Sequence, residues 1–410
     1  MFTEKDRRRS REAPNDDSHS KQGISRLVPM PSLSAGTRKT ENKIIHGDNE
    51  RALDAMARDL EGAVKCIYID PPYNNNESYE HYKDNDPHNV WISSVVSCVR
   101  QLRRFLSDAG SIWISIDEKQ LHYLKVALDD VFDRENFITT IVWQQRTTRE
   151  NRKVFSNNHE YVLLYARDYS KFKASRGLLP WTNEIADRFK NPDNDPRGPW
   201  QSVSANAQAG HATASQFYEL VAPDGTRHRP PNGRCWVYDE RRMRAEISKG
   251  NIWFGREGNG VPRIKRFLSE TKRGITPHTL WLADEVGTND SAKKHLLNLL
   301  PEETVFDTPK PEGLIRRILE IATLPGELVL DAYLGSGTTA AVAQKMGRRY
   351  IGIEIGDHII THCVERLRKV IAGELGGISR EIGWTGGGGY EFLRLDVSDA
   401  DRGRRIKGAR

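Results

Sequence analysis

The stretch IYIDPPYN, residues 67–74, sets an apolar run directly against a carboxylate, two prolines and an aromatic ring. The run from Val64 to Ile69 is β-branched and aromatic, which is typical of a strand buried on both faces of a parallel sheet. Pro71 and Pro72 cannot donate to a sheet and each fixes φ, so the chain must leave the strand as a stiff, extended turn. In open α/β sheets, ligands bind at this carboxyl edge. The stretch alone is equally consistent with an ordinary exit from a strand.

Composition narrows the class of protein. The chain has 410 residues, enough for two or three domains, and carries a net charge of +6 with a pI near 9.0. This modest positive excess favours an acidic partner such as nucleic acid. The longest apolar runs are far shorter than the roughly 20 residues of a membrane span, and the N-terminus lacks the apolar core of a signal peptide. We therefore expect a cytoplasmic protein with no membrane contact. The cysteines, Cys66, Cys98, Cys235 and Cys363, have no paired spacing, which predicts neither a metal site nor disulfides.

Sequence periodicity divides the chain into five segments. Residues 41–167 and 302–400 alternate strand-like and helix-like runs, which predicts two halves of a doubly wound α/β sheet. Between them, residues 168–301 contain short strands, turns and basic clusters, and we expect a separate irregular domain there. Residues 1–40 hold nine Lys or Arg against five Asp or Glu, with almost no apolar periodicity, which predicts a disordered basic arm. Residues 401–410 form a basic tail, and both ends are more typical of solvated termini than of specific DNA contacts.

A glycine-rich turn forms the second motif. DAYLGSGTT runs from Asp331 to Thr339 and directly follows a predicted strand. Backbone amides at the start of the next helix would face a ligand over the sheet edge. The following strand ends in Glu354, nineteen residues after Gly335, where an acidic side chain can take both ribose hydroxyls of an adenosine. By itself this pattern fits a nicotinamide site, an S-adenosylmethionine site or a plain strand–helix turn.

The two motifs together favour S-adenosylmethionine. That cofactor carries a sulfonium methyl group, and the amine of a nucleobase must be pulled toward tetrahedral geometry before it can attack. The Asp70 carboxylate and the Pro71 carbonyl can each accept one amino hydrogen, and the prolines hold both acceptors rigid. Tyr73 would stack on a target base, which must be flipped out of the duplex. The predicted catalytic residues are Asp70, Pro71, Pro72 and Tyr73. Nicotinamide chemistry has no use for such a turn.

Ten segments in order carry a resemblance to a known family. They are HGDN (46–49), YIDPPYN (68–74), GSIWISID (110–117), VFDRENFITTIVW (131–143), NHEYVLLYAR (158–167), NPDNDPRGPW (191–200), VPRIKRFLSE (261–270), FDTPKPEGLIRRIL (306–319), LDAYLGSGTT (330–339) and GGGGYEFLRL (386–395). The chain resembles the amino-methylating DNA methyltransferases of the permuted beta class, most of all the modification subunits of type III restriction systems and their stand-alone relatives. The resemblance implies a seven-stranded, mostly parallel, Rossmann-like methyltransferase sheet that is circularly permuted and carries an inserted, irregular target-recognition domain.

The resemblance also implies how S-adenosylmethionine is held. The Thr-Pro-Lys-Pro segment, 308–311, would hold its methionine end with Lys310 near the carboxylate, and Asp331 would meet its amino group. Asp48 either contributes to the site or only caps the helix that begins near Asn49. The expected cofactor residues are Asp48, Asp70, Thr308, Pro309, Lys310, Asp331, Tyr333, Gly335, Ser336, Gly337, Thr338 and Glu354. Tyr333 stands where many relatives have Phe, which keeps the aromatic ring.

The middle domain is the expected DNA reader. Its basic side chains lie among aromatic ones in the sequence, and phosphate contacts would position the domain while a few side chains read base edges. The expected DNA-binding residues are Arg241, Arg244, Arg263, Lys265 and Arg266, near Trp236, Tyr238, Trp253 and Phe254. For each single arginine, a solvated surface position is the alternative.

The predicted activity is site-specific methyl transfer to N6 of a flipped adenine in a short duplex site. Chemistry alone leaves N4 of cytosine open, and Asp70 favours adenine only through the resemblance, because family members with Asp there mostly methylate adenine. A catalytically silent DNA-binding protein is the alternative from another class. The expected partners are double-stranded DNA, a second copy of the chain and a restriction subunit. The chain is short beside typical modification subunits, and it contains no G-x-x-x-x-G-K-[ST] element for an ATPase.

Overall fold

The structure is a computed structural model that describes residues 25–75, 84–151, 154–181, 183–271, 274–303 and 306–397. Most of the predicted basic arm (1–24) and the whole basic tail (401–410) therefore lie outside the described residues. The described residues form two compact units, the first made of those up to 177 and from 278 onward, the second of those within Leu178–Pro277. Each unit is described by itself.

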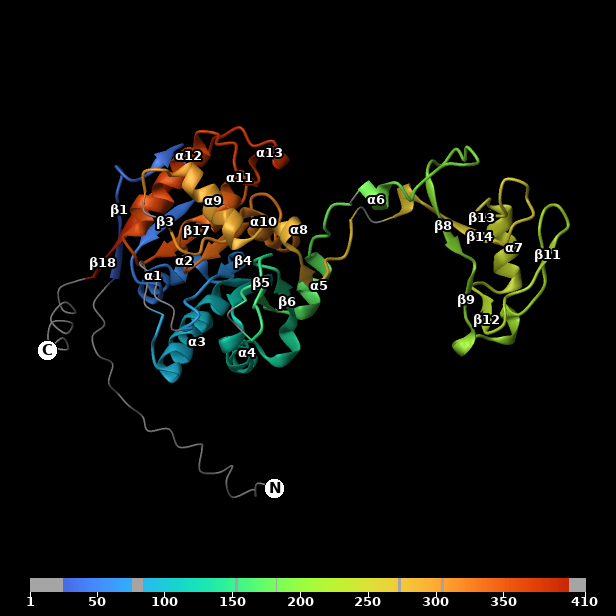
Figure 1. The fold of residues 1–410 in the computed structure, drawn as a ribbon, viewed down its shortest axis with the longest axis horizontal. Helices are drawn as coiled ribbons and strands as arrows, with labels where there is room; N and C mark the ends of the chain where they lie inside the picture. Colours follow the sequence, from blue (N-terminus) through green and yellow to red (C-terminus); the bar gives the residue numbers. More distant parts are fainter. Residues whose placement is uncertain are drawn as a thin grey trace, which may run out of the picture. The chain divides into compact units, whose positions relative to one another are not determined.

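An eleven-stranded sheet forms the centre of the first unit (Figure 1). Its central strands follow the order β3-β17-β16-β4-β5-β7-β6, and within this set β7 is the strand that runs antiparallel to its neighbours. Their bounds are β3 (Lys43–His46), β17 (Arg349–Glu354), β16 (Leu328–Asp331), β4 (Val64–Ile69), β5 (Leu106–Ile116), β7 (Glu160–Ala166) and β6 (Phe137–Trp143). These strands confirm the predicted doubly wound, mostly parallel sheet. β4 from the first half of the chain pairs with β16 from the last part, as a permuted order requires.

Four further strands extend this sheet beyond the seven that were predicted. They are β1 (Ser25–Pro29), β2 (Ala35–Gly36), β15 (Leu280–Trp281) and β18 (Gly389–Val397). β1 pairs antiparallel with β18 from Ser25 to Pro29, so the expectation of a disordered arm is wrong for residues 25–29. The local pattern misses β1 because a five-residue edge strand depends on a partner distant in sequence rather than on its own propensity.

Helices pack against both faces of the sheet. On one face, Ile67 and Ile69 of β4 pack with apolar side chains from α1, α3 and α4. Successive side chains of a strand point to opposite faces, and the other face receives α10, which contacts β4 and β5 and packs against α11. The helix bounds are α1 (Asn49–Ala55), α2 (Ala57–Leu60), α3 (His88–Phe105), α4 (Glu118–Phe132), α10 (Glu312–Ala322), α11 (Thr338–Lys345), α12 (Glu365–Ile371) and α13 (Ser379–Ile382), with a π-helix at Ile359–Val364. In α3, buried Trp91, Val95 and Val99 recur every four residues, which is the spacing of one helix face.

The second unit is a small assembly of short elements around its own core. β13 (Ile252–Trp253), β14 (Arg263–Phe267) and β8 (Trp200–Ser204) form an antiparallel sheet. Two further pairs are β9 (Asn206–Gln208) with β12 (Arg234–Trp236) and β10 (Leu220–Val221) with β11 (Arg227–His228), and the helices are α6 (Asn183–Ala186) and α7 (Glu240–Ser248). Trp236, Met243 and Phe254 are buried together in the core.

This second unit is shorter than the segment 168–301 that the sequence pattern set apart. α5 (Tyr169–Ser175) contacts β5 and β7 and therefore belongs to the first unit, as do α8 (Ala283–Val286) and α9 (Asn289–Leu299). Short helices and strands beside long turns have similar sequence patterns in both units. The local pattern therefore does not show to which unit a short element belongs. Among the described residues, no helix is both long enough and apolar enough to cross a membrane.

Candidate active site

A cavity of about 580 Å³ lies at the carboxyl ends of the central strands. Its walls come from residues that follow β3, β4, β5, β16 and β17, so segments far apart in the chain meet there. It is lined by these predicted site residues: Asp48, Asp70, Pro71, Pro72, Tyr73, Thr308, Pro309, Lys310, Asp331, Tyr333, Gly335, Ser336, Thr338 and Glu354. Gly337 does not line the cavity; it precedes α11 in the left-handed conformation.

The turn after β4 is fixed by side chains from outside it. Trp91 of α3 donates from Nε1 to the Pro72 carbonyl at 2.6 Å. The Asp84 carboxylate accepts the backbone amides of Asn74 at 2.6 Å and Asn75 at 2.9 Å, and Asn74 has a positive φ of 52°. One buried carboxylate thus holds two consecutive amides through charge-assisted hydrogen bonds. The sequence analysis did not identify Asp84 or Trp91, because neither lies in the motif that it positions.

Asp70, Tyr73, Glu160 and Lys310 form a polar cluster in the cavity wall. Lys310 Nζ lies 2.9 Å from Asp70 Oδ2 and 3.5 Å from Glu160 Oε2. The Tyr73 hydroxyl lies 2.8 Å from Asp70 Oδ1 and 3.0 Å from Glu160 Oε2. Because a hydroxyl has one proton, it donates to one of these carboxylates at a time. Asn289 holds the other side of Glu160 by donating from Nδ2 to Oε1 at 3.2 Å.

The charged groups of this cluster determine the protonation states of Lys310 and Tyr73. Burial acts to lower the pKa of Lys310, but Asp70 and Glu160 outweigh it and hold that pKa above its ordinary value. Burial, and then the two carboxylates, raise the pKa of Tyr73 well above 10, so it remains a neutral donor. The expected contact of Lys310 with the cofactor carboxylate stays a prediction; in this structure its ammonium pairs with Asp70 and Glu160. Glu160 was quoted within a family segment but was not assigned a role, since nothing local marks it as facing Asp70.

The glycine turn after β16 is held by Glu354 at the end of β17. Glu354 Oε2 accepts the Gly335 amide at 2.8 Å, and Oε1 accepts the amides of Ile355 at 2.9 Å and Gly356 at 3.0 Å. Although burial acts to raise the pKa of Glu354, His358 and then the amides of Gly356 and Gly335 hold it below its ordinary value. Oε1 accepts two amides and lies 3.4 Å from His358 Nε2, whereas Oε2 accepts the Gly335 amide and has a second acceptor position that a ribose hydroxyl could use. That Glu354 takes both ribose hydroxyls stays a prediction.

Asp331 ends β16 as a buried carboxylate. Its Oδ2 accepts the Thr339 hydroxyl at 2.6 Å and its Oδ1 accepts the Tyr333 amide at 3.0 Å. Burial raises the pKa of Asp331 to about 7, and these hydrogen bonds offset only part of that rise. A bound cationic amine at this point would therefore stabilise the ionised form of Asp331.

A buried charge network lies next to Thr338 and Lys310 in the cavity wall. The Thr338 hydroxyl donates to the Lys310 carbonyl at 3.1 Å and accepts from Arg366 at 2.8 Å. Arg366 pairs with Glu312 at 3.0 Å, and Glu312 pairs with Lys345 at 2.7 Å. We call this set, with Glu374, the support network. The sequence contains no signal for it, because its members come from α10, α11, α12 and the turn that follows α12, and they meet only in the fold.

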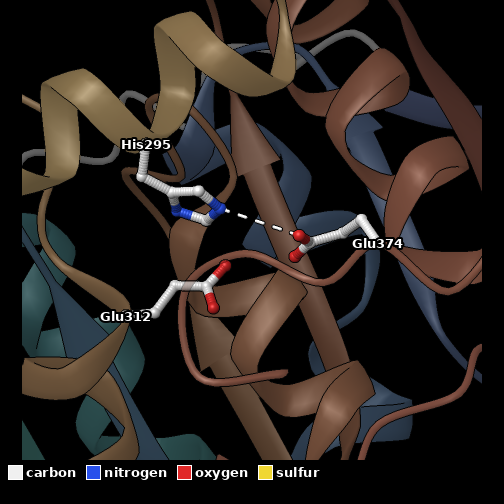
Figure 2. Close-up of side chains that lie close together, drawn as sticks. All are labelled: His295, Glu312 and Glu374. Carbon is white, nitrogen blue, oxygen red and sulfur yellow. Dashed lines mark ion pairs between the residues drawn. The ribbon is translucent and has the colours of Figure 1, made fainter. Parts of the chain in front are cut away.

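His295, Glu312 and Glu374 place one ligand atom each within 4.8 Å of one another, a spacing at which a metal ion can bind (Figure 2). His295 Nε2 lies 3.8 Å from Glu374 Oε2. Lys345, however, forms ion pairs with both Glu312 and Glu374, so the cationic charge that a metal would bring is already present. We therefore interpret this cluster as part of the support network rather than as a metal site.

Asp48 begins α1 as its N-cap. Its carboxylate accepts the Arg51 amide at 3.1 Å, so the capping role that the sequence analysis considered is confirmed, while its contribution to cofactor binding stays a prediction. His159 also lines the cavity, and its Nε2 lies 2.8 Å from the Tyr161 hydroxyl.

The second unit contains the expected DNA-binding residues. Arg241, Arg244, Arg263 and Arg266 are exposed. Lys265 is buried and pairs with Asp193 and, at 2.8 Å, with Asp195, so the expectation of a DNA contact is not supported for it. Of the aromatic residues quoted beside them, Trp236 and Phe254 are buried in the core of the unit. The mixture of basic and aromatic residues in this segment therefore reflects, in part, the packing of the core of the second unit.

Comparisons with known proteins add the family. Residues 64–365 match the profile of N6 and N4 methyltransferases described as DNA methylase. The chain is 29% identical to a probable type III restriction-modification enzyme HindVI Mod subunit of Haemophilus influenzae, over 87% of this chain and 54% of that protein. It is 29% identical to the StyLTI Mod subunit of Salmonella typhimurium, over 75% of this chain and 50% of that protein. It is 23% identical to the DNA adenine methyltransferase YhdJ of Escherichia coli, over 79% of this chain and 82% of that protein. The chain thus spans about half the length of both Mod subunits.

Proposed function

The chain belongs to the DNA methylase family, and we propose that it transfers the methyl group of S-adenosylmethionine to N6 of an adenine in duplex DNA. The observation that carries this proposal is that the Asp70 turn and the glycine turn line one cavity although Asp70 and Gly335 are 265 positions apart in the sequence. A volume of about 580 Å³ lies in the range of natural ligand sites.

The residues present fit the cofactor. Asp331 is a buried carboxylate whose pKa is raised to about 7, which suits contact with a cationic amino group. Glu354 keeps an acceptor for the ribose, and the amides of the glycine turn border the same wall. Bound S-adenosylmethionine supplies an electrophilic methyl group. The chain's own contribution is to bind the cofactor, orient the amine and remove its proton.

The catalytic turn orients the target amine. Asp70 and the Pro71 carbonyl would accept the two amino hydrogens and direct the lone pair toward the methyl group. Trp91 and Asp84 hold this turn in place before the substrate arrives, and such preorganisation is the main source of electrostatic catalysis. After transfer, Asp70 can receive the proton, with the Tyr73 hydroxyl and Glu160 next to it.

Adenine is the proposed base and duplex DNA the proposed substrate. The support is Asp70 at the first position of the catalytic turn, together with a relative named as a DNA adenine methyltransferase. The exposed arginines of the second unit are the proposed phosphate contacts. A restriction subunit is a further proposed partner, on the basis of the Mod subunits among the relatives.

In vitro methylation tests this function directly. Purified protein is incubated with radiolabelled S-adenosylmethionine and mixed-sequence duplex DNA, and the nucleosides are analysed by mass spectrometry. We expect N6-methyladenine at one short sequence. Asp70→Ala should abolish transfer while cofactor affinity, measured by calorimetry, changes little, because the cofactor contacts lie mainly in 308–311 and 331–354. N4-methylcytosine would overturn the choice of base, and full activity of Asp70→Ala would overturn the mechanism.

A further inference from the structure

The loop that joins β6 to β7 carries the two most exposed large apolar side chains in the described part of the chain. Val154 is 95% exposed and Phe155 is 84% exposed. Single exposed apolar residues are common on protein surfaces. Two neighbours at a loop tip, one of them aromatic, are less easily explained, because burying an aromatic ring is worth several kcal/mol of transfer free energy, at roughly 25 cal/mol per Å².

The same loop borders the catalytic cavity at both of its ends. Gln145 and Arg146 line the cavity where the loop begins, and Asn157 and His159 line it where the loop returns to β7. The tip therefore belongs to a segment that starts and finishes at the site proposed to receive the target base. The exposed Arg149 adds a positive charge to this segment.

Internal hydrogen bonds hold the base of the loop closed. Asn158 donates from Nδ2 to the Thr148 carbonyl at 3.0 Å and to the Arg146 carbonyl at 3.3 Å. The Ser156 hydroxyl donates to Asn158 Oδ1 at 2.6 Å and accepts the Glu150 amide at 2.9 Å. These hydrogen bonds thus connect the two ends of the loop through polar groups. The apolar side chains of Val154 and Phe155 are not packed against the sheet and remain exposed.

We propose that Phe155, flanked by Val154, inserts into the DNA duplex and fills the space that the target base leaves when it turns into the cavity. This inference rests on the proposed function. A paired base must be unpaired and unstacked before it reaches a catalytic site, which costs a few kcal/mol. Several DNA-bending proteins insert apolar side chains between base steps, so a duplex can accept such a side chain. An aromatic ring also restores stacking for the bases that remain in the helix, and that stacking is worth about 1–3 kcal/mol per base.

The test compares two duplexes that differ only opposite the target adenine, one with thymine and one with an abasic site. If Phe155 helps to open the base pair of the target adenine, its loss should matter less on the abasic duplex, where the adenine has no pairing partner. We expect Phe155→Ala to lower kcat/KM on the paired duplex by about 5- to 150-fold, the equivalent of the lost stacking. On the abasic duplex it should stay within about threefold of the wild type, and Phe155→Trp should retain activity on both.

Base flipping is read separately with 2-aminopurine at the target position. Fluorescence should rise when wild-type protein binds and should rise much less with Phe155→Ala. The control is Leu324→Ala, which removes another exposed apolar side chain of the first unit, one that does not line the cavity. It should match the wild type on both duplexes.

The outcomes separate the insertion from the function on which it rests. Equal losses on the two duplexes, or unchanged activity of Phe155→Ala on the paired duplex, would refute the insertion while leaving methyl transfer established. A wild-type protein that methylates neither duplex at its recognised site would refute the proposed function, and the insertion with it.

Discussion

Replacement of Lys310 by Met tests whether the polar cluster depends on its single cation. The side chain lies within 2.9 Å of Asp70 and 3.5 Å of Glu160 and is almost fully buried. Met keeps a similar volume and removes the charge, so the two carboxylates remain without their shared partner. We expect the first unit to lose stability and the cofactor to bind less tightly.

The magnitude follows from these distances. With an effective dielectric constant near 20, the attraction is about 6 kcal/mol for the shorter pair and about 5 kcal/mol for the longer one, before the cost of removing the charges from water. Measured losses for breaking buried pairs by removing one partner are smaller, about 3–5 kcal/mol, and we expect this range.

Hydrogen exchange with mass spectrometry suits this test because it reports on the peptides of β4 and β16 separately from the second unit. The control is Lys294→Met, which breaks an ion pair of the same kind with Asp290 at 2.8 Å where both side chains are 72% exposed. It should change the free energy of unfolding by no more than about 0.5 kcal/mol. Equal protection in the two mutants at pH 8 would show that Lys310 contributes no net stability.

Other residues give separate tests. Asp84→Asn should lower kcat about tenfold with little change in the cofactor dissociation constant, because the Asn side chain has one oxygen for the two backbone amides that Asp84 now accepts. Parallel changes in kcat and in the dissociation constant would contradict a role confined to the turn. Cofactor affinity measured by calorimetry should rise between about pH 5.5 and pH 7.5 as Asp331, whose pKa is raised to about 7, ionises. Asp331→Asn should remove this rise, and an equal rise in the mutant would assign it to another group. Arg266→Met should reduce the salt dependence of DNA binding by about one counterion and leave the second unit stable. Lys265→Met should destabilise that unit by about 3–5 kcal/mol because Asp193 and Asp195 lose a shared partner, and denaturant unfolding that shows the reverse order for these two mutants would refute the assignment.

The sequence predicted those features that short segments determine locally. β4 and its proline turn follow from a run of β-branched residues that ends at Pro71, and the glycine turn follows from a strand that meets Gly335 and Gly337. The positions of Asp70 and Glu354 at the carboxyl ends of β4 and β17, the parallel strands on either side of β16, then follow from sheet topology. These are the features that the fold confirms most closely.

Side-chain partners distant in sequence could not be predicted in the same way. Lys310 is 150 residues from Glu160, and no periodicity indicates that the two meet. Lys265 illustrates the opposite error, because its basic neighbours predict a DNA contact while two aspartates more than 60 residues earlier hold it inside the unit. A run of basic residues predicts the charge of a protein surface only where the ion-pair partners of those residues are also close in the sequence.

The support network explains how a turn made largely of small residues can hold a defined shape. Glycines give the backbone the freedom to approach a ligand closely, but they provide no side chain to fix it. Here the fixing groups are Thr338 and Arg366, and Arg366 is in turn held by Glu312, with Lys345 and Glu374 completing two cations and two anions. Replacing such a balanced set by apolar residues of similar volume can leave stability unchanged. The hydrogen bond from Arg366 to Thr338 would nevertheless be lost, and with it the fixed orientation of the hydroxyl that donates to the Lys310 carbonyl. The charges are therefore better explained by the geometry that they impose on the cavity wall at Thr338 and Lys310 than by any stability that they add.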